Sequence, residues 1–125
     1  MTLIYDAGVL IAADRDDRRV WAAHRARLDF GLVPITTAPA VAQASRSARQ
    51  AQLHRFLRGC AVVAFMPVEA HAVGSLLERD GTADVVDAHL VLVAATSGAT
   101  VLTSDVEDIS SLSSRLPSPV RVLPV

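Results

Sequence analysis

Short apolar segments alternate with longer segments of helical periodicity along the chain. The short segments are rich in β-branched residues and predict strands at 2–5, 32–36, 61–66, 100–103 and 120–123. The longer segments carry apolar residues three and four positions apart and predict helices at 7–13, 20–28, 40–45, 47–57, 68–79, 83–96 and 105–116. The alternation is typical of an α/β protein.

Capping residues and glycines support these boundaries. Thr37 followed by Pro39 predicts a helix start, because a hydroxyl caps the first turn and proline suits its first positions. Thr82 is predicted to cap the helix at 83–96, and Gly98 to end it. Strands separated by helices pair in parallel through crossovers. We therefore expect one domain over residues 1–125, a three-layer sandwich with a mostly parallel sheet of about five strands covered by helices.

Composition excludes several classes of protein. With 51% hydrophobic and 20% charged residues, the 125-residue chain has the makeup of a folded domain. All 12 basic residues are arginines, so the lysine of a P-loop nucleotide site, a Schiff-base enzyme or a receiver domain is missing. The net charge of −1 is not the basic excess usual for nucleic-acid binding.

The remaining composition predicts a cytoplasmic protein that does not enter a membrane. Cys60 is the one cysteine and has no partner for an internal disulfide, which fits a reducing compartment. The first residues lack the basic segment of a signal peptide. The longest uncharged stretches are shorter than a membrane span and are interrupted by proline or glycine.

Four aspartates occupy positions that predict a common site. Asp6 follows the first predicted strand and Asp105 the fourth, while Asp84 and Asp87 lie near the start of a strongly apolar helix. Ligands of parallel sheets bind beyond the carboxyl ends of the strands. Converging carboxylates repel one another unless a cation joins them, and Mg²⁺ prefers oxygen ligands. Each aspartate alone also fits a helix N-cap or first turn, so the hypothesis rests on their joint placement.

Three motifs in order resemble the PIN-domain ribonucleases, in particular the VapC-like toxins of toxin–antitoxin pairs. The segment Ile4-Tyr5-Asp6-Ala7-Gly8-Val9-Leu10-Ile11 is similar to the family's first motif. The stretch from Asp87 to Ala95 resembles the third, an aspartate followed by an apolar helix with paired alanines. The stretch from Gly98 to Asp105 resembles the fourth, a strand that ends in Thr-x-Asp. The resemblance covers essentially the whole chain.

The resemblance implies a function and partners. Asp6, Asp87 and Asp105 would hold one or two Mg²⁺ or Mn²⁺ ions, and water activated by the metal would hydrolyse an RNA phosphodiester bond. Thr103 or Ser104 would orient that water or a ligand. The resemblance further implies a homodimer and a small VapB-like antitoxin whose segment crosses the acidic site.

One position departs from the family pattern. The family usually has a glutamate in the helix after the second strand, where this chain has Gln43. Gln43 can offer an oxygen but no charge, and Asp84 is a candidate metal ligand in its place. Arg46, the arginine nearest to Gln43, is a candidate for binding RNA phosphate.

Two other classes of function stay open. A catalytically impaired PIN-like module would bind RNA or a partner protein without cleaving it, and a metal-dependent phosphatase is a weaker third reading. The charge count is compatible with RNA, because without the four aspartates the net charge of −1 becomes +3. The sequence thus predicts an acidic pocket in a mildly basic surface, which attracts phosphate once metal is bound.

Overall fold

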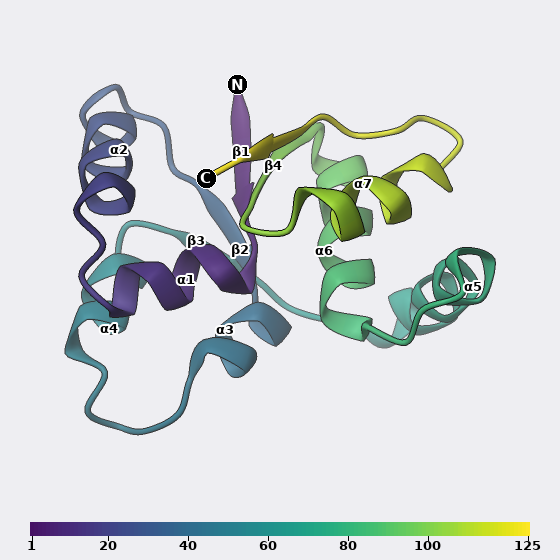
Figure 1. Cartoon of the computed structure of the whole chain (residues 1–125), viewed down its shortest axis with the longest axis horizontal. Helices are drawn as coiled ribbons and strands as arrows, with labels where there is room; N and C mark the ends of the chain where they lie inside the picture. Colours follow the sequence, from purple (N-terminus) through teal and green to yellow (C-terminus); the bar gives the residue numbers. More distant parts are fainter.

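Five parallel strands form one sheet at the centre of the molecule. The computed structural model describes all 125 residues (Figure 1). The strands lie in the order β3-β2-β1-β4-β5 and comprise β1 Thr2–Tyr5, β2 Ile35–Thr37, β3 Ala61–Val63, β4 Ala99–Thr103 and β5 Val122–Pro124. Every pairing is parallel. The predicted five-stranded sheet is therefore confirmed, and it is entirely rather than mostly parallel.

Helices cover both faces of this sheet. They are α1 Ala7–Asp14, α2 Arg18–Asp29, α3 Ala38–Ala44, α4 Ala51–Leu57, α5 Ala70–Asp80, α6 Val85–Ser97 and α7 Val106–Ser114, with a 3₁₀ turn, η1, at Pro67–Glu69. Figure 1 shows α1, α2 and α4 on one side of the strands and α5, α6 and α7 on the other. The three-layer α/β architecture expected from the sequence is confirmed. None of the helices is long and apolar enough to cross a membrane.

The core is continuous from α1 through the sheet to α6. The side chains of Ile4, Leu10, Leu90 and Val101 are fully buried. Burial of each of these apolar side chains stabilises the fold by roughly 2 kcal/mol. The helix predicted at 83–96 is buried as expected, because α6 packs against β1 and β4 and lies under α5 and α7. This burial fixes the end of α6 that carries Asp84 and Asp87.

The predicted helix caps are confirmed at Thr37 and wrong at Thr82. The Thr37 hydroxyl accepts a hydrogen bond from the Ala40 amide, and proline occupies the first turn of α3. At the start of α6 it is the Asp84 carboxylate that accepts from the Asp87 amide, at 3.0 Å. Carboxylate and hydroxyl groups both cap helices well. Gly81 ends α5 in a left-handed conformation and residues 82–84 are not helical, so α6 begins only at Val85.

Other boundaries shift by a few residues. The strand expected at 32–36 forms at Ile35–Thr37, the one at 61–66 ends at Val63, and the one at 120–123 is Val122–Pro124. The helix expected at 47–57 begins only at Ala51. Residues 47–50 form a turn instead, in which the Gln50 side chain accepts hydrogen bonds from the amides of Arg46 and Ser47.

Candidate active site

The β1–β4 register places the first acid beside the end of the fourth strand. Tyr5 pairs with Leu102, and the Asp6 amide donates to the Leu102 carbonyl at 3.2 Å. Asp6 therefore lies beside Thr103, although 97 positions separate them in the sequence. Strands far apart in the chain thus meet at the carboxyl edge of the sheet, where ligands bind in open parallel sheets.

Asp6 is a buried carboxylate that is held on both oxygens. It is 4% exposed. Its Oδ1 accepts from the Val9 amide at 2.9 Å and caps α1, while Oδ2 accepts from the Thr103 hydroxyl and from the Ser104 amide at 3.3 Å. Burial raises the pKa of Asp6, and these hydrogen bonds oppose the rise. The carboxylate is thereby fixed in direction without a charged partner.

Thr103 joins the two strand-end aspartates. Its hydroxyl donates to Asp6 and accepts from the Asp105 amide at 2.8 Å. Asp105 in turn caps α7, because its Oδ1 accepts from the Asp108 amide at 3.3 Å. A hydrogen bond with Asp105 also raises the pKa of the exposed Asp108, so the acidic group extends one turn into α7.

Asp87 is influenced by the charges of the three other aspartates. Burial, followed by the charges of Asp84, Asp6 and Asp105, raises the pKa of Asp87 to about 7. A carboxyl group with this pKa is protonated in about half of the molecules at neutral pH. The four aspartates therefore interact electrostatically in the folded chain, and their use as one metal site stays a prediction.

No basic side chain neutralises this cluster. The two ion pairs of the structure join His89 with Glu69 and Arg115 with Asp80. Compensation comes instead from helix N-termini, since Asp6, Asp84 and Asp105 are the N-caps of α1, α6 and α7. Carboxylates are favourable there because of the amide dipoles. Asp6, Asp84 and Asp105 therefore each cap a helix and also belong to the acidic cluster.

The donor atoms fit a hard divalent cation. All candidate ligands are carboxylate oxygens, which suit Mg²⁺ or Mn²⁺. The raised pKa of Asp87 reflects burial and, after it, repulsion by the other acids, which a cation would offset. The side chains do not form a ready-made set of three or more metal ligands. Mg²⁺ commonly keeps several waters between itself and protein carboxylates, so a looser arrangement is compatible with it.

Gly8, which has no proposed role in the sequence analysis, shapes the floor of the site. A Cβ at Gly8 would lie 1.9 Å from the Ser104 hydroxyl oxygen and 3.3 Å from Asp6 Oδ1. Only glycine lets the loop after β4 approach the first turn of α1 this closely. The signal was present in the first motif, where Gly8 follows Asp6 by two positions.

Gln43 and Arg46 lie outside the hydrogen-bonded cluster. Both are exposed, and both line a polar hollow of about 330 Å³ between the end of α1 and the α3–α4 loop. Neither side chain hydrogen-bonds to the four aspartates. The same hollow is lined by Arg15, which the sequence analysis did not single out.

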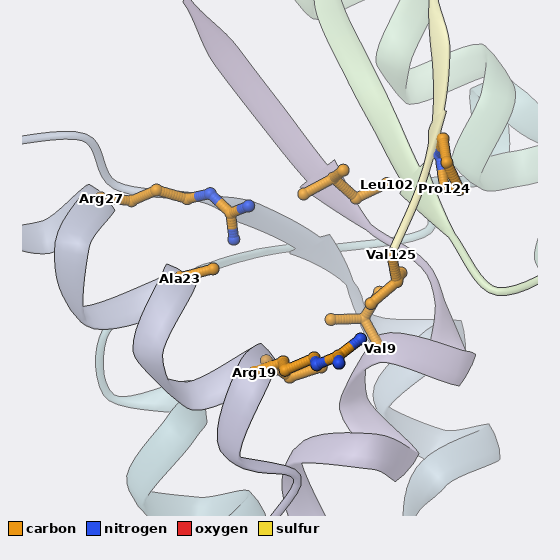
Figure 2. Close-up of a pocket in the computed structure, with 8 residues that line it drawn as sticks. Val9, Arg19, Ala23, Arg27, Leu102, Pro124 and Val125 are labelled. Carbon is orange, nitrogen blue, oxygen red and sulfur yellow. The ribbon is translucent and has the colours of Figure 1, made fainter.

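An apolar cavity elsewhere in the molecule lacks these acids. It has a volume of about 220 Å³ and is lined by apolar side chains that include Val9, Leu102 and Val125. Figure 2 shows Arg19 and Arg27 extending toward them from α2. The chemistry that the sequence predicts is therefore located at the sheet edge and not in this cavity.

Comparisons with known proteins identify the fold. No family model and no curated protein matches the chain. Among solved structures, a chain of VapBC2 from Rickettsia felis, bound to a DNA fragment from its promoter, superposes with a TM-score of 0.75 at 16% identity, covering 100% of this chain and 99% of that chain. PAE2754 from Pyrobaculum aerophilum matches with a TM-score of 0.64 at 19% identity, covering 100% and 92%.

A third structure agrees with these two. FitAcB from Neisseria gonorrhoeae has a TM-score of 0.61 at 18% identity, covering 97% of this chain and 96% of that chain. At such identities the likeness establishes the fold. The chain therefore has the PIN-like fold that its motifs resemble.

Proposed function

We propose that this chain is a metal-dependent endoribonuclease of the VapC-like toxin type, which hydrolyses RNA phosphodiester bonds. One observation carries the proposal: burial, together with the charges of Asp84, Asp6 and Asp105, raises the pKa of Asp87 to about 7, and no basic side chain is paired with any of these aspartates. Strongly perturbed carboxyl groups that gather at a sheet edge mark functional sites more often than structural ones.

The proposed site assigns a task to each residue. Asp6, Asp87 and Asp105, together with Asp84, would hold Mg²⁺ or Mn²⁺, directly or through water. The metal, when bound, supplies a more acidic water and positive charge for phosphodiester hydrolysis. Thr103 keeps Asp6 and the Asp105 backbone in register through its two hydrogen bonds.

Proton exchange is part of the same proposal. Asp87 has to release its proton before it can act as a ligand, because a metal binds the ionised carboxylate. Ser104 is exposed beside Asp6 and is available to orient water or an RNA phosphate oxygen by a hydrogen bond.

The test is cleavage of labelled RNA with Mg²⁺ or Mn²⁺ and with EDTA. We expect cleavage in metal alone, and its loss in D6N, D87N and D105N, which keep the size of each side chain. D29N is the matched control, because Asp29 is an exposed aspartate at the end of α2. Cleavage that persists in all three site variants, or in EDTA, contradicts the proposal.

We also propose an antitoxin partner, a homodimer and a cytoplasmic location. The solved neighbours support the antitoxin, since VapBC2 and a further match, FitAB (TM-score 0.64 at 16% identity), are by their names two-component assemblies, each bound to a DNA fragment. Val62, Met66 and Val68, on and after the edge strand β3, are 49%, 52% and 84% exposed. Exposed apolar residues at a sheet edge favour association. Light scattering at several concentrations tests the dimer.

The alternative is a PIN-like module that binds RNA or a partner protein without cleaving RNA. It is favoured by Gln43, which brings no charge and no contact to the acidic cluster, and by the lack of a ready-made ligand set. This alternative predicts salt-sensitive binding of RNA with no cleavage in either metal. The cleavage experiment above therefore separates the two functions.

A further inference from the structure

A groove runs along the exposed face of α1. It starts beside the acidic cluster and leads away from it. One hollow, of about 560 Å³, is lined by Gly8, Ile11, Arg15 and Ser104 among others. The hollow that Gln43 and Arg46 line also contains Ile11 and Arg15. Because the two hollows share these residues, they adjoin along α1, from Gly8 and Ser104 at one end to the α3–α4 loop at the other. We call the two hollows together the α1 groove.

Two arginines in the α1 groove have no acidic partner. Arg15 forms no ion pair and no side-chain hydrogen bond. Arg46 uses its guanidinium only for the carbonyl of the adjacent Ser45, at 2.8 Å. Two acids also line the groove, and both accept hydrogen bonds from other groups: Asp14 from the Gln50 side chain, and Asp17 from the Arg19 and Val20 amides. Free guanidinium groups in a groove are the groups that recognise phosphate oxygens best.

Gln50 holds the loop that carries Arg46. Its Oε1 accepts from the amides of Arg46 and Ser47, and its Nε2 donates to the Ala44 carbonyl at 2.9 Å and to Asp14 Oδ2 at 3.0 Å. The amide has thereby used both of its hydrogens and its oxygen. The loop is tied to the end of α1, so Arg46 is presented to the groove in a fixed place.

The distance along α1 suits an extended strand of nucleic acid. Gly8 and Arg15 are seven residues apart, which corresponds to about 10 Å of helix. A phosphate at Arg15 therefore belongs to a nucleotide next to the one at the acidic cluster. The apolar side chains that line the groove are small, namely Ile11, Ala12 and Ala44, whereas protein partners are anchored by larger apolar side chains.

We propose that Arg15 and Arg46 each bind a backbone phosphate of single-stranded RNA one or more nucleotides from the cleaved bond, with Gln50 as a positioning residue. This inference rests on the proposed function, since it assigns the path of the substrate away from that site. In this proposal the bound RNA strand extends from the four carboxylates along the α1 groove.

Salt dependence of RNA binding tests the proposal. The probe is a fluorescein-labelled single-stranded RNA of about 12 nucleotides, measured by anisotropy with Mg²⁺ in D87N, where the proposed function predicts no cleavage. Each phosphate contact contributes about 0.7 to the slope of log affinity against log salt. R15Q and R46Q should each reduce that slope by about 0.7 and, from the same relation, weaken binding about fivefold near 0.1 M salt.

R121Q is the matched control. Arg121 is exposed and directly precedes β5, so it lies at the opposite edge of the parallel sheet from the acids. We expect its slope to equal that of the parent. Q50A should weaken binding in the parent but have no further effect in R46Q, because Gln50 acts through Arg46; independent effects would assign it a general structural role.

The outcomes separate this inference from the proposed function. Unchanged slopes in R15Q and R46Q, or no binding of the probe at all, overturn the α1 groove as a phosphate site. A polyglutamate peptide of equal charge that binds as tightly as the RNA, with the same loss in R15Q, also overturns it in favour of an acidic protein segment. Reduced slopes without any cleavage by the unmutated protein keep the groove and refute the nuclease.

Discussion

The proposed metal binding should depend on pH in the physiological range, because Asp87 carries a proton there. The pKa of this carboxyl group is about 7, because of burial and of the charges of Asp84, Asp6 and Asp105. A divalent cation competes with that proton for the same oxygens. Raising the pH through 7 should therefore tighten binding of Mg²⁺ or Mn²⁺ without any change in structure.

The magnitude follows from the printed pKa. For one competing proton with a pKa of about 7, affinity should rise about fivefold from pH 6 to pH 7 and about twofold from pH 7 to pH 8. Binding should release about 0.9 proton per site at pH 6 and about half a proton at pH 7. Among the three charges, that of Asp84 has the largest effect on Asp87. D84N should therefore lower the pKa of Asp87 and reduce the increase in metal affinity between pH 6 and 7.

Calorimetric titration of Mn²⁺ in buffers of different ionisation enthalpy measures both quantities. D29N again serves as the control for loss of an exposed negative charge. The reasoning is refuted if affinity is constant from pH 6 to 8 with no proton released. A steeper rise in D84N than in the parent would refute the part assigned to Asp84.

The same pKa predicts the stability of the metal-free protein. Asp87 has a folded-state pKa of about 7, above its unfolded value of about 3.9. Its contribution to stability is therefore fully present below pH 4 and is lost as the pH rises to 7. In EDTA, D87N should raise the melting temperature relative to the parent at pH 8 and not at pH 4. Equal differences at both pH values would contradict the raised pKa.

Three further predictions concern the surroundings of the site. Gly8→Ala forces a Cβ against Ser104 and should cost about 1–3 kcal/mol of unfolding free energy; adding Ser104→Gly should recover part of it, and simple additivity would refute the contact. Thr103→Val should weaken Mn²⁺ binding about tenfold because it removes both hydrogen bonds of the hydroxyl, whereas Thr100→Val, which removes a hydroxyl with no such role, should not. Burial lowers the pKa of His24. The stability advantage of the parent over His24→Asn should therefore be present above pH 6.5 and shrink as the pH falls through the folded-state pKa. Urea unfolding at a series of pH values measures this advantage, and an advantage that is constant with pH would contradict the lowered pKa.

Local features of the fold were predictable because they depend on neighbours in the sequence. Apolar periodicity located every strand and helix to within a few residues, and the Thr37–Pro39 signal marked the start of α3. The Thr82 cap was wrong because Asp84, two positions further along, caps the helix instead by accepting from the Asp87 amide. Competing caps differ by less than about 1 kcal/mol, so sequence alone does not decide between them.

The positions of the four aspartates were predictable for the same reason, whereas the raised pKa of Asp87 was not. Strand ends placed Asp6 and Asp105, and the apolar helix placed Asp87, because each position is set by a local pattern. The pKa of Asp87 depends on burial, on the nearby Asp84, and on the charges of Asp6 and Asp105. Of these, burial and the last two charges arise only in the folded chain, where β1 pairs with β4 and the Thr103 hydroxyl hydrogen-bonds to Asp6.

The sequence by itself determined the alternation of strands and helices, the absence of lysine chemistry and the identity of the four carboxylates. Only the tertiary structure decided that Gly8 must lack a side chain, that Gln43 faces the α1 groove, and that Arg15 stands near Arg46. Periodicity and capping act over one or two turns of chain. Pairing order, burial and electrostatic coupling act across the folded molecule, where residues distant in sequence share the same low-dielectric surroundings.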